Sequence, residues 1–190
     1  LHLCHHNLEK ISDTDTTTTD NLLLEVCMAA KYEGQSIRYY YPIYKAIYND
    51  YGSTICTVLA RSFADIGDIV RGRDLFYGNT HESTQRKQLD KNLKRIFEKI
   101  HSGLTDSGAK THYQDNDKKN FFQLREDWWT ANRATIWEAI TCNDDKKLRD
   151  ASYFLPTCSM NGSGAQDNNK CRCISGDVPT YFDYVPQFLR

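Results

Sequence analysis

One segment constrains the fold of this chain more than any other, because its apolar residues recur at the spacing of a helix. In residues 55–79, apolar side chains stand at positions 55, 59, 63, 66 and 70. This spacing predicts a helix with a wide apolar stripe facing a core. Ser53 or Thr54 is suited to cap its first turn, and Gly72 suits a left-handed residue after its last. Gly67 costs about 1 kcal/mol in mid-helix, so we expect a helix or a large ring to approach it closely.

Three other segments carry apolar stripes of helical period, and no useful stretch alternates as a strand does. We therefore predict an all-α fold with helices near residues 21–37, 54–72, 83–101 and 118–141. Asp117 is the expected cap of the last helix, and residues 102–118 are expected to form a loop. That last helix is apolar over two adjoining stripes, which predicts burial of Trp128, Trp129 and Trp137 in the core.

Six tyrosines surround Pro42, at positions 39, 40, 41, 44, 48 and 51. Proline disfavours helical backbone at the preceding residue, so the first helix is expected to be interrupted at Tyr41. We expect about half of these rings to be buried. The alternative is an exposed aromatic patch for recognition, because rings supply contact area at low entropy cost.

The central helix also carries two acids, Asp65 and Asp68, at the i, i+3 spacing of paired catalytic or metal-binding carboxylates. Arg61 stands four residues before the first and Arg71 three residues after the second. Local ion pairs explain this pattern, and no second acidic motif completes a metal site. We interpret this helix as scaffold.

Seven cysteines in 190 residues indicate an oxidising compartment, and the odd number leaves one thiol free or bonded outside this piece. The length suits one domain, and we expect the chain to be a fragment of a longer protein. A first group of possible metal ligands is His2, Cys4, His5 and His6. No second pair of zinc ligands at the usual spacing accompanies it, so surface histidines beside a disulfide cysteine are the preferred interpretation. No cofactor or metal is expected.

The predicted helix at 83–101 is unusually basic for a chain of net charge −1. Its outer face carries the residues Arg86, Lys87, Lys91, Lys94, Arg95 and Lys99. Three acids, Glu82, Asp90 and Glu98, oppose them, which leaves a balance of 6 − 3 = +3. A solvated face is the simpler interpretation. The functional one is a site for a sulfated glycan or another polyanion, bound largely through counterion release.

Catalytic motifs are lacking: no nucleophile elbow, phosphate loop or zinc-protease helix occurs, and we expect no enzyme. No run reaches 18 apolar residues, so no membrane-spanning segment is predicted, and no signal-peptide pattern opens the chain. The near-neutral charge gives no field that would favour nucleic acid.

Residues 59–79, LARSFADIGDIVRGRDLFYGN, resemble the signature block of the Duffy-binding-like domain, in its alpha class from the erythrocyte membrane adhesins of the malaria parasite. Further blocks agree and occur in family order: LHLCHHNLE at 1–9, LLEVCMAAKYEGQSI at 23–37, LREDWWTANRATIWEAITC at 124–142, KCRC at 170–173 and VPTYFDYVPQFLR at 178–190. The resemblance implies a partial domain, a helical bundle cross-linked by disulfides and with long loops. It divides the chain into the end of a first subdomain (1–20), a helical second subdomain (21–177) and the start of a third (178–190).

The resemblance also implies a function, host-cell adhesion by a variant antigen on the surface of infected erythrocytes. The implied partners are a host receptor, such as a sulfated glycosaminoglycan, a blood-group sugar or a complement receptor, and neighbouring domains of the same adhesin. The implied location is the extracellular face of the infected cell, in the ectodomain of a membrane protein. The alternative is a structural and antigenic domain that braces a receptor-binding neighbour.

For the disulfides, Cys27 lies on the predicted buried face of the first helix and Cys142 ends the tryptophan helix, so we pair them. The resemblance to more distant Duffy-binding proteins suggests Cys56–Cys173, with Cys158–Cys171 closing a short loop. Cys171 and Cys173 could exchange partners. Cys4 is left unpaired within this piece.

Overall fold

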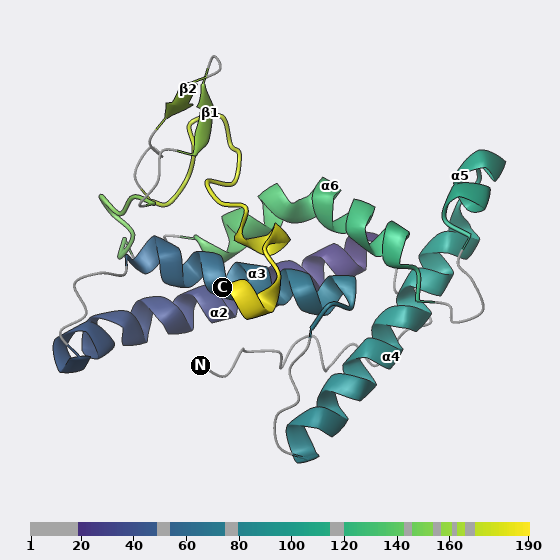
Figure 1. Cartoon of the computed structure of the whole chain (residues 1–190), viewed down its shortest axis with the longest axis horizontal. Helices are drawn as coiled ribbons and strands as arrows, with labels where there is room; N and C mark the ends of the chain where they lie inside the picture. Colours follow the sequence, from purple (N-terminus) through teal and green to yellow (C-terminus); the bar gives the residue numbers. More distant parts are fainter. Residues whose placement is uncertain are drawn as a thin grey trace.

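The protein is built mainly from helices, as Figure 1 shows. The computed structural model describes residues 19–48, 54–74, 80–114, 120–142, 146–153, 157–160, 163–165 and 170–190. The helices are α2 (Thr19–Tyr48), α3 (Ile55–Arg71), α4 (Thr80–Gly103), α5 (Ser107–His112) and α6 (Phe122–Ile140). Strands β1 (Cys158–Met160) and β2 (Ser163–Ala165) pair antiparallel, and the short 3-10 helices η1 (Phe182–Tyr184) and η2 (Gln187–Leu189) follow. The prediction of a helical fold is confirmed, with one small hairpin added to it.

Helix α3 lies at the centre, packed against α2, α6 and η1, and its ends are formed as predicted. The Thr54 hydroxyl accepts a hydrogen bond from the Thr57 amide at 3.2 Å, and Gly72 follows the helix in the left-handed region at φ 72°. At Gly67 a Cβ atom would lie 2.8 Å from the Trp129 ring. The glycine therefore lets α6 bring a large ring against the backbone of α3, as its position in the sequence suggested.

The core between these helices is aromatic. Phe63 lies between two indoles, with ring centroids 5.0 Å from Trp129 and 5.2 Å from Trp137. Both of these tryptophans are at most 1% exposed and Trp128 is 6% exposed, so their predicted burial is confirmed. Offset and edge-on aromatic pairs add about 0.5–1.5 kcal/mol each to the free energy gained from burying their area.

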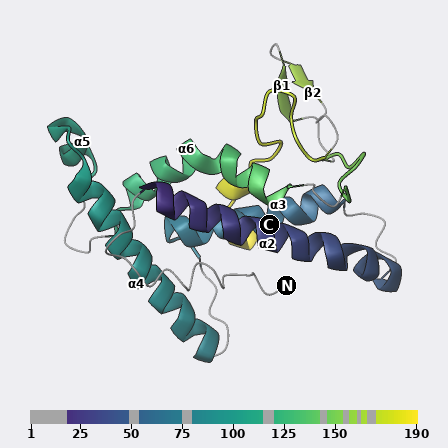
Figure 2. The ribbon, with the colours of Figure 1, turned by 180° about the vertical axis from the view of Figure 1, so that it is seen from behind.

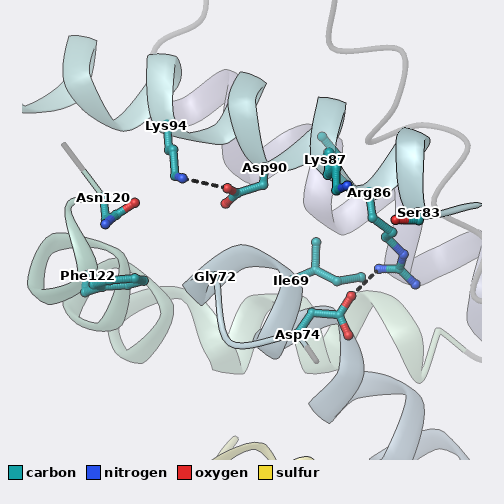
Figure 3. A pocket seen from close by; sticks show the side chains of 11 residues that line it. Ile69, Gly72, Asp74, Ser83, Arg86, Lys87, Asp90, Lys94, Asn120 and Phe122 are labelled. Atoms are coloured by element: carbon teal, nitrogen blue, oxygen red, sulfur yellow. Dashed lines mark ion pairs between the residues drawn. The ribbon is translucent and has the colours of Figure 1, made fainter. Parts of the chain in front are cut away.

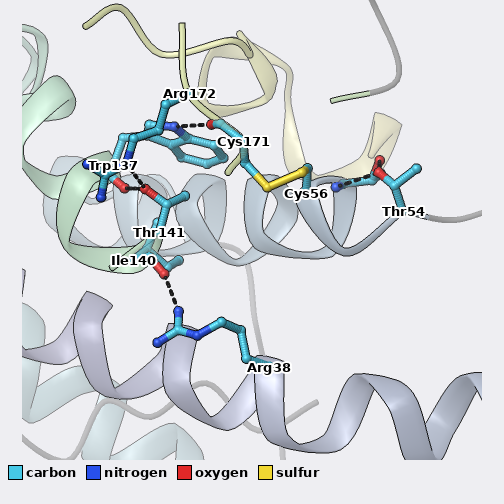
Figure 4. The surroundings of a disulfide bond; sticks show 9 residues. Arg38, Thr54, Cys56, Trp137, Ile140, Thr141, Cys171 and Arg172 are labelled. Atoms are coloured by element: carbon cyan, nitrogen blue, oxygen red, sulfur yellow. Dashed lines mark hydrogen bonds between the residues drawn. A yellow bond between two sulfur atoms is a disulfide. The ribbon is translucent and has the colours of Figure 1, made fainter. Parts of the chain in front are cut away.

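Helices α2 and α6 approach closely at the carboxyl end of α6. The Arg38 side chain donates to the Ile140 carbonyl at 3.0 Å, which satisfies one of the terminal acceptors of that helix (Figure 4). The same carbonyl would lie 2.0 Å from a Cβ atom at Gly34, so this position needs glycine. Gly34 thus sets the spacing of α2 and α6, and Arg38 caps the carboxyl end of α6.

Helix α2 is longer than predicted and runs through Pro42 to Tyr48. The expected interruption is wrong. Proline disfavours helix in the residue before it, but its own fixed φ of about −65° is helical, so it does not forbid a helix. The rings of Tyr39, Tyr40 and Tyr44 are 51–60% exposed. Tyr41 is half-buried, so the structure shows an exposed set of three rings on this helix. Tyr51 and the side chain of Tyr48 lie outside the described residues, and the expected burial of half of the six rings stays a prediction.

Two other boundaries differ from the prediction. The expected loop at 102–118 contains the short helix α5, which Asp106 caps by accepting from the Ala109 amide at 2.6 Å. Helix α6 begins at Phe122, after Phe121 in the left-handed region at φ 53°. The predicted cap Asp117 lies outside the described residues.

Two disulfides tie the irregular carboxyl-terminal region together, and their pairing corrects the prediction. Cys56 bonds Cys171, and Cys158 bonds Cys173, each with a Cα–Cα distance of 5.5 Å. The predicted pairs Cys56–Cys173 and Cys158–Cys171 are therefore wrong, although the alternative left open is the one formed. The Trp137 indole donates to the Cys171 carbonyl at 2.9 Å and holds that cysteine over the start of α3 (Figure 4).

The third predicted bond, Cys27–Cys142, is also wrong, because both thiols are unpaired. Gly34 and Arg38 contact Ile140, which places Cys142 beside the later part of α2. Cys27 precedes Gly34 by seven residues, or roughly 10 Å of helix rise. A disulfide needs Cα atoms within about 7 Å. Burial raises the pKa of the Cys27 thiol to about 11. Cys4, predicted to be unpaired, lies outside the described residues.

Candidate functional site

Helix α4 lies across one end of the layer formed by α2, α3 and α6, and extends beyond it in both views (Figures 1 and 2). Its predicted apolar stripe is confirmed: Leu89, Leu93, Ile96 and Phe97 are at most 2% exposed. The Phe97 ring stands edge-on to Trp128, with centroids 6.0 Å apart. This anchored stripe fixes the rotation of α4 and so decides which of its basic residues face outward.

The six predicted basic residues fall into two groups. Lys87, Lys91 and Arg95 are exposed, and they form one line along α4 because they are spaced at i, i+4 and i+8. We call these three residues the basic stripe. None of them makes an ion pair with a side chain that the structure describes. The stripe extends over about 12 Å at the rise of an α-helix.

The other three basic residues are less exposed than predicted. Arg86 is only 18% exposed and pairs with Asp74 at 3.1 Å, so its expected exposure is wrong. Lys94 is 37% exposed and pairs with Asp90 at 2.8 Å, and Lys99 is half-buried. Arg86 is thus neutralised by an acid from the segment after α3, and Lys94 by an acid of the same helix.

A groove of about 260 Å³ opens between α4 and the layer beneath it (Figure 3). Helix α4 contributes the polar and charged side chains Ser83, Arg86, Lys87, Asp90 and Lys94. The opposite side comprises Ile69, Gly72, Asp74, Asn120 and Phe122, from the end of α3 and the start of α6. Among the residues that the structure describes, five charges line it, three positive and two negative, so their balance is 3 − 2 = +1.

The floor of the groove is held from below by Arg125, which is fully buried. Its guanidinium donates to the carbonyls of Val70 at 2.6 Å and Ile69 at 3.2 Å, and to Asp90 at 3.2 Å. It thereby joins α6 to the end of α3 and to α4. A Cβ atom at Gly72 would lie 2.8 Å from this guanidinium, a second reason for glycine there.

The acids of α3 form a separate, structural cluster. The predicted pair of Asp68 with Arg71 is confirmed, at 3.1 Å. The partner of Asp65 is Arg190 at 3.2 Å, rather than the expected Arg61, which is exposed. Burial raises the pKa of Asp65 to about 6, and the nearby Arg190 acts against that rise. These contacts agree with the interpretation of α3 as scaffold.

A third acid, Asp183, completes this cluster. The Asp183 carboxylate is fully buried and accepts two bonds from Arg133, at 2.8 and 2.9 Å, and one from the Trp129 indole at 2.9 Å. Its carbonyl accepts from Arg71. The segment that carries η1 is thus fixed to both α3 and α6.

Metal ligands do not gather in the part of the chain that the structure describes: it contains no group of three His, Cys, Asp or Glu side chains placed for an ion. The histidines around Cys4 lie outside that part. Among the same described residues, no helix is long and apolar enough to span a bilayer.

Sequence reasoning found the basic helix but missed the groove. Asp74, Asn120 and Phe122 line it from segments that show no pattern linking them to α4. Only the docking of α4 brings them together, so no spacing in the sequence could have indicated this site.

Comparison with known proteins gives a consistent result. The model of the Duffy binding domain matches residues 1–190. The NTS-DBL1α domain of membrane protein 1 (PfEMP1) from Plasmodium falciparum, varO strain, is 43% identical with a TM-score of 0.77. The match covers 99% of this chain and 40% of that one, so this chain spans about two fifths of the solved domain. No curated protein matches the chain.

Two further solved structures are similar. One is the double domain NTS-DBL1α and CIDRγ of the same strain, 43% identical with a TM-score of 0.79, in which the match covers 99% of this chain and 25% of that one. The other is an ICAM-1-binding DBLβ domain of another PfEMP1, 30% identical with a TM-score of 0.68, covered to 39% by the whole of this chain. These relatives are domains of a surface protein rather than members of enzyme families.

Proposed function

This chain belongs to the Duffy binding domain family, and from that premise we propose that it is part of an adhesion module that binds a sulfated glycan on host cells. The ligand contacts the basic stripe of Lys87, Lys91 and Arg95. The module acts by binding and carries out no catalysis. Its place is the outer surface of the infected erythrocyte, within the ectodomain of a longer membrane protein.

The observation that carries this proposal is the exposure of the basic stripe. Most other arginines near α4 are buried or paired, as Arg86 and Arg125 are. The three stripe residues instead present their cations to solvent along one edge of the molecule. Clustered cations bind polyanions by releasing condensed counterions, and the rigid helix fixes the spacing of the three charges in advance.

The relatives support a receptor on the host cell. A related DBLβ domain has been solved bound to human ICAM-1, at 27% identity and a TM-score of 0.64. We extend receptor binding, though not that receptor, to the domain from which this chain comes. A glycan and a protein receptor are compatible, since the stripe occupies one edge of one helix only.

The test is the triple variant Lys87→Glu, Lys91→Glu, Arg95→Glu, applied to a heparin column with a sodium chloride gradient. We expect the variant to elute at markedly lower salt and its binding to depend less on salt, because three cation contacts are lost. The free energy of unfolding should change by no more than about 1 kcal/mol, since exposed charges contribute little to stability.

The matched control reverses three exposed cations in the irregular region, Lys146, Arg149 and Lys170. It makes the same change in net charge and should shift elution much less. Equal shifts for the two variants would mean that net charge alone governs retention, and the stripe would then have no specific role.

A second candidate is the structural domain that braces a neighbour, and the exposed rings of Tyr39, Tyr40 and Tyr44 on α2 favour it. A large apolar surface of this kind suits a protein neighbour better than a sulfated chain. Retention on heparin that is independent of the stripe, together with loss of a domain–domain contact in Tyr→Ser variants, would favour this candidate.

A further inference from the structure

The groove beside the basic stripe differs from the stripe in chemistry. At one end, the Phe122 ring stands near Asn120, Asp90 and Lys94, and an open space lies between them (Figure 3). Phe122 is 48% exposed although it begins the helix that buries Leu124 and Trp129 in the core. Binding of a polyanion by counterion release requires cations only, so it does not explain an exposed aromatic ring in a polar groove.

This end of the groove combines an apolar face with directional polar groups. The Asn120 amide supplies donors and an acceptor, and the Asp90 carboxylate, paired with Lys94 at 2.8 Å, supplies acceptors. Asp90 is also held by Arg125 at 3.2 Å, so its position is fixed before any ligand arrives. Preorganised groups of this kind lower the entropy cost of binding.

Volume and charge limit what the groove can hold. A cavity of about 260 Å³ is below the range of roughly 300–1,000 Å³ typical of drug-sized ligands. It suits one small ring. Because the described lining residues have a charge balance of only +1, the groove suits a neutral or weakly charged ring better than a compact, highly charged anion. A sugar unit has C–H faces for an aromatic ring and a rim of hydroxyls for polar groups.

From this arrangement we infer that the groove binds a single sugar unit of a sulfated glycan, which stacks on Phe122 and bonds Asn120 and Asp90. The rest of the glycan lies along the basic stripe, which adjoins the groove because Lys87 belongs to both. The stripe supplies electrostatic attraction, and the groove recognises the sugar itself. This inference rests on the proposed function and adds to it a subsite that selects sugar over other polyanions.

The groove is tested with a heparin-derived tetrasaccharide, by calorimetry on the folded protein. Phe122→Ala should weaken binding about two- to tenfold, the range expected for losing one aromatic contact. Phe122→Leu should weaken binding similarly, because leucine lacks the flat ring although it is apolar. Phe122→Tyr keeps the ring and should retain binding. The matched control is Tyr40→Ala, an exposed ring on α2, which should leave binding unchanged.

Several outcomes would overturn the inference. Unchanged affinity of Phe122→Ala and Asn120→Ala would do so, and so would displacement of the tetrasaccharide by equimolar inorganic sulfate, which would indicate a simple anion site. The two proposals fail separately. The proposal for the groove alone is wrong if reversal of the stripe abolishes heparin retention but the groove variants have no effect on binding. The proposal for the stripe alone is wrong if reversal of its charges leaves heparin retention intact while Phe122→Ala still weakens binding of the tetrasaccharide.

Discussion

In the layer of α2, α3 and α6, three arginine side chains are buried and bonded to backbone carbonyls, whereas on α4 the basic stripe lies in solvent. Arg38, Arg71 and Arg125 are all at most 2% exposed, while Arg95 is exposed. The buried guanidiniums each join two or more segments. The same residue type therefore acts as a structural cross-link in one region and as a surface cation in the other.

The difference shows what decides the role of an arginine. A buried guanidinium is stable only where acceptors surround it, because an unpaired charge in the interior is very costly. The carboxyl ends of α3 and α6 supply such acceptors, since the last carbonyls of a helix lack partners within it. Lys87, Lys91 and Arg95 on α4 have no ion-pair partner among the described side chains, so these cations keep their hydration and are available to a ligand.

The largest expected effect concerns the disulfide that closes the core region. Replacing Cys56 and Cys171 by alanine opens a loop with a sequence separation of 115, worth about 4.7 kcal/mol in the chain-entropy model. Removing Cys158–Cys173, with a separation of 15, should cost about 3 kcal/mol. Urea denaturation measures both. Equal costs would contradict the long-range role given to the first bond.

Peptide mapping tests the pairing itself. Trypsin can cut after Lys170 and Arg172, which separates Cys171 from Cys173. Under non-reducing conditions, mass spectrometry should find the Cys171 peptide linked to that of Cys56, and the Cys173 peptide linked to that of Cys158. If the Cys56 peptide were instead linked to that of Cys173, and the Cys158 peptide to that of Cys171, the pairing predicted from the sequence would be the correct one.

The next effect compares Arg125 with Arg95 directly. Arg125→Met should lower the free energy of unfolding by about 3–5 kcal/mol, because Asp90 loses its buried partner and two carbonyls lose their donor. Arg95→Met should change it by no more than about 0.5 kcal/mol, as is usual for exposed sites. Chemical denaturation of both variants measures the contrast. Similar values would mean that the two regions do not differ as described.

Two glycines give a smaller contrast between the same regions. Gly67→Ala on α3 should destabilise by about 1–3 kcal/mol, because the new methyl group would lie 2.8 Å from the Trp129 ring. Gly103→Ala at the end of α4 meets nothing within 4 Å and should be neutral or stabilising by up to about 1 kcal/mol. Thermal unfolding distinguishes the two. A stable Gly67→Ala variant would show that α3 and α6 can separate.

The smallest effect is the pH dependence due to Asp65. Its pKa rises from 3.8 to about 6 on folding, so the native state holds this proton more tightly than the unfolded state. Stability from this group is present below about pH 4 and is lost as the pH rises through 6. The effect should be small, because the side chain is 43% exposed and Arg190, Asp68, Asp74 and Arg86 also act on it.

Asp65→Asn provides the measurement. Its stability relative to the unchanged protein should increase between pH 4 and pH 6, as followed by urea denaturation across that range. A constant difference across this range would show that the carboxyl group titrates normally in the folded protein.

Prediction from sequence succeeded where contacts are local. The two ends of α3 depend on Thr54 and Gly72, each within four residues of the groups it bonds, and both were identified. The apolar stripe of α4 also follows from spacing alone, and so does the pair of Asp68 with Arg71. The choice between Cys171 and Cys173 failed, because two cysteines so close in sequence are distinguished by contacts with distant segments, such as the Trp137 hydrogen bond to the Cys171 carbonyl.

The sequence by itself determined the helical class, the family, the burial of the three tryptophans and the presence of a basic helix. Each follows from residue type and short-range period. Only the tertiary structure decided which cations of α4 remain exposed and which residues line the groove. It also set the partner of Asp65, which is Arg190 and lies 125 positions away. These features depend on how separate helices dock, and docking is fixed by the shapes of side chains distant in sequence, which no local pattern records.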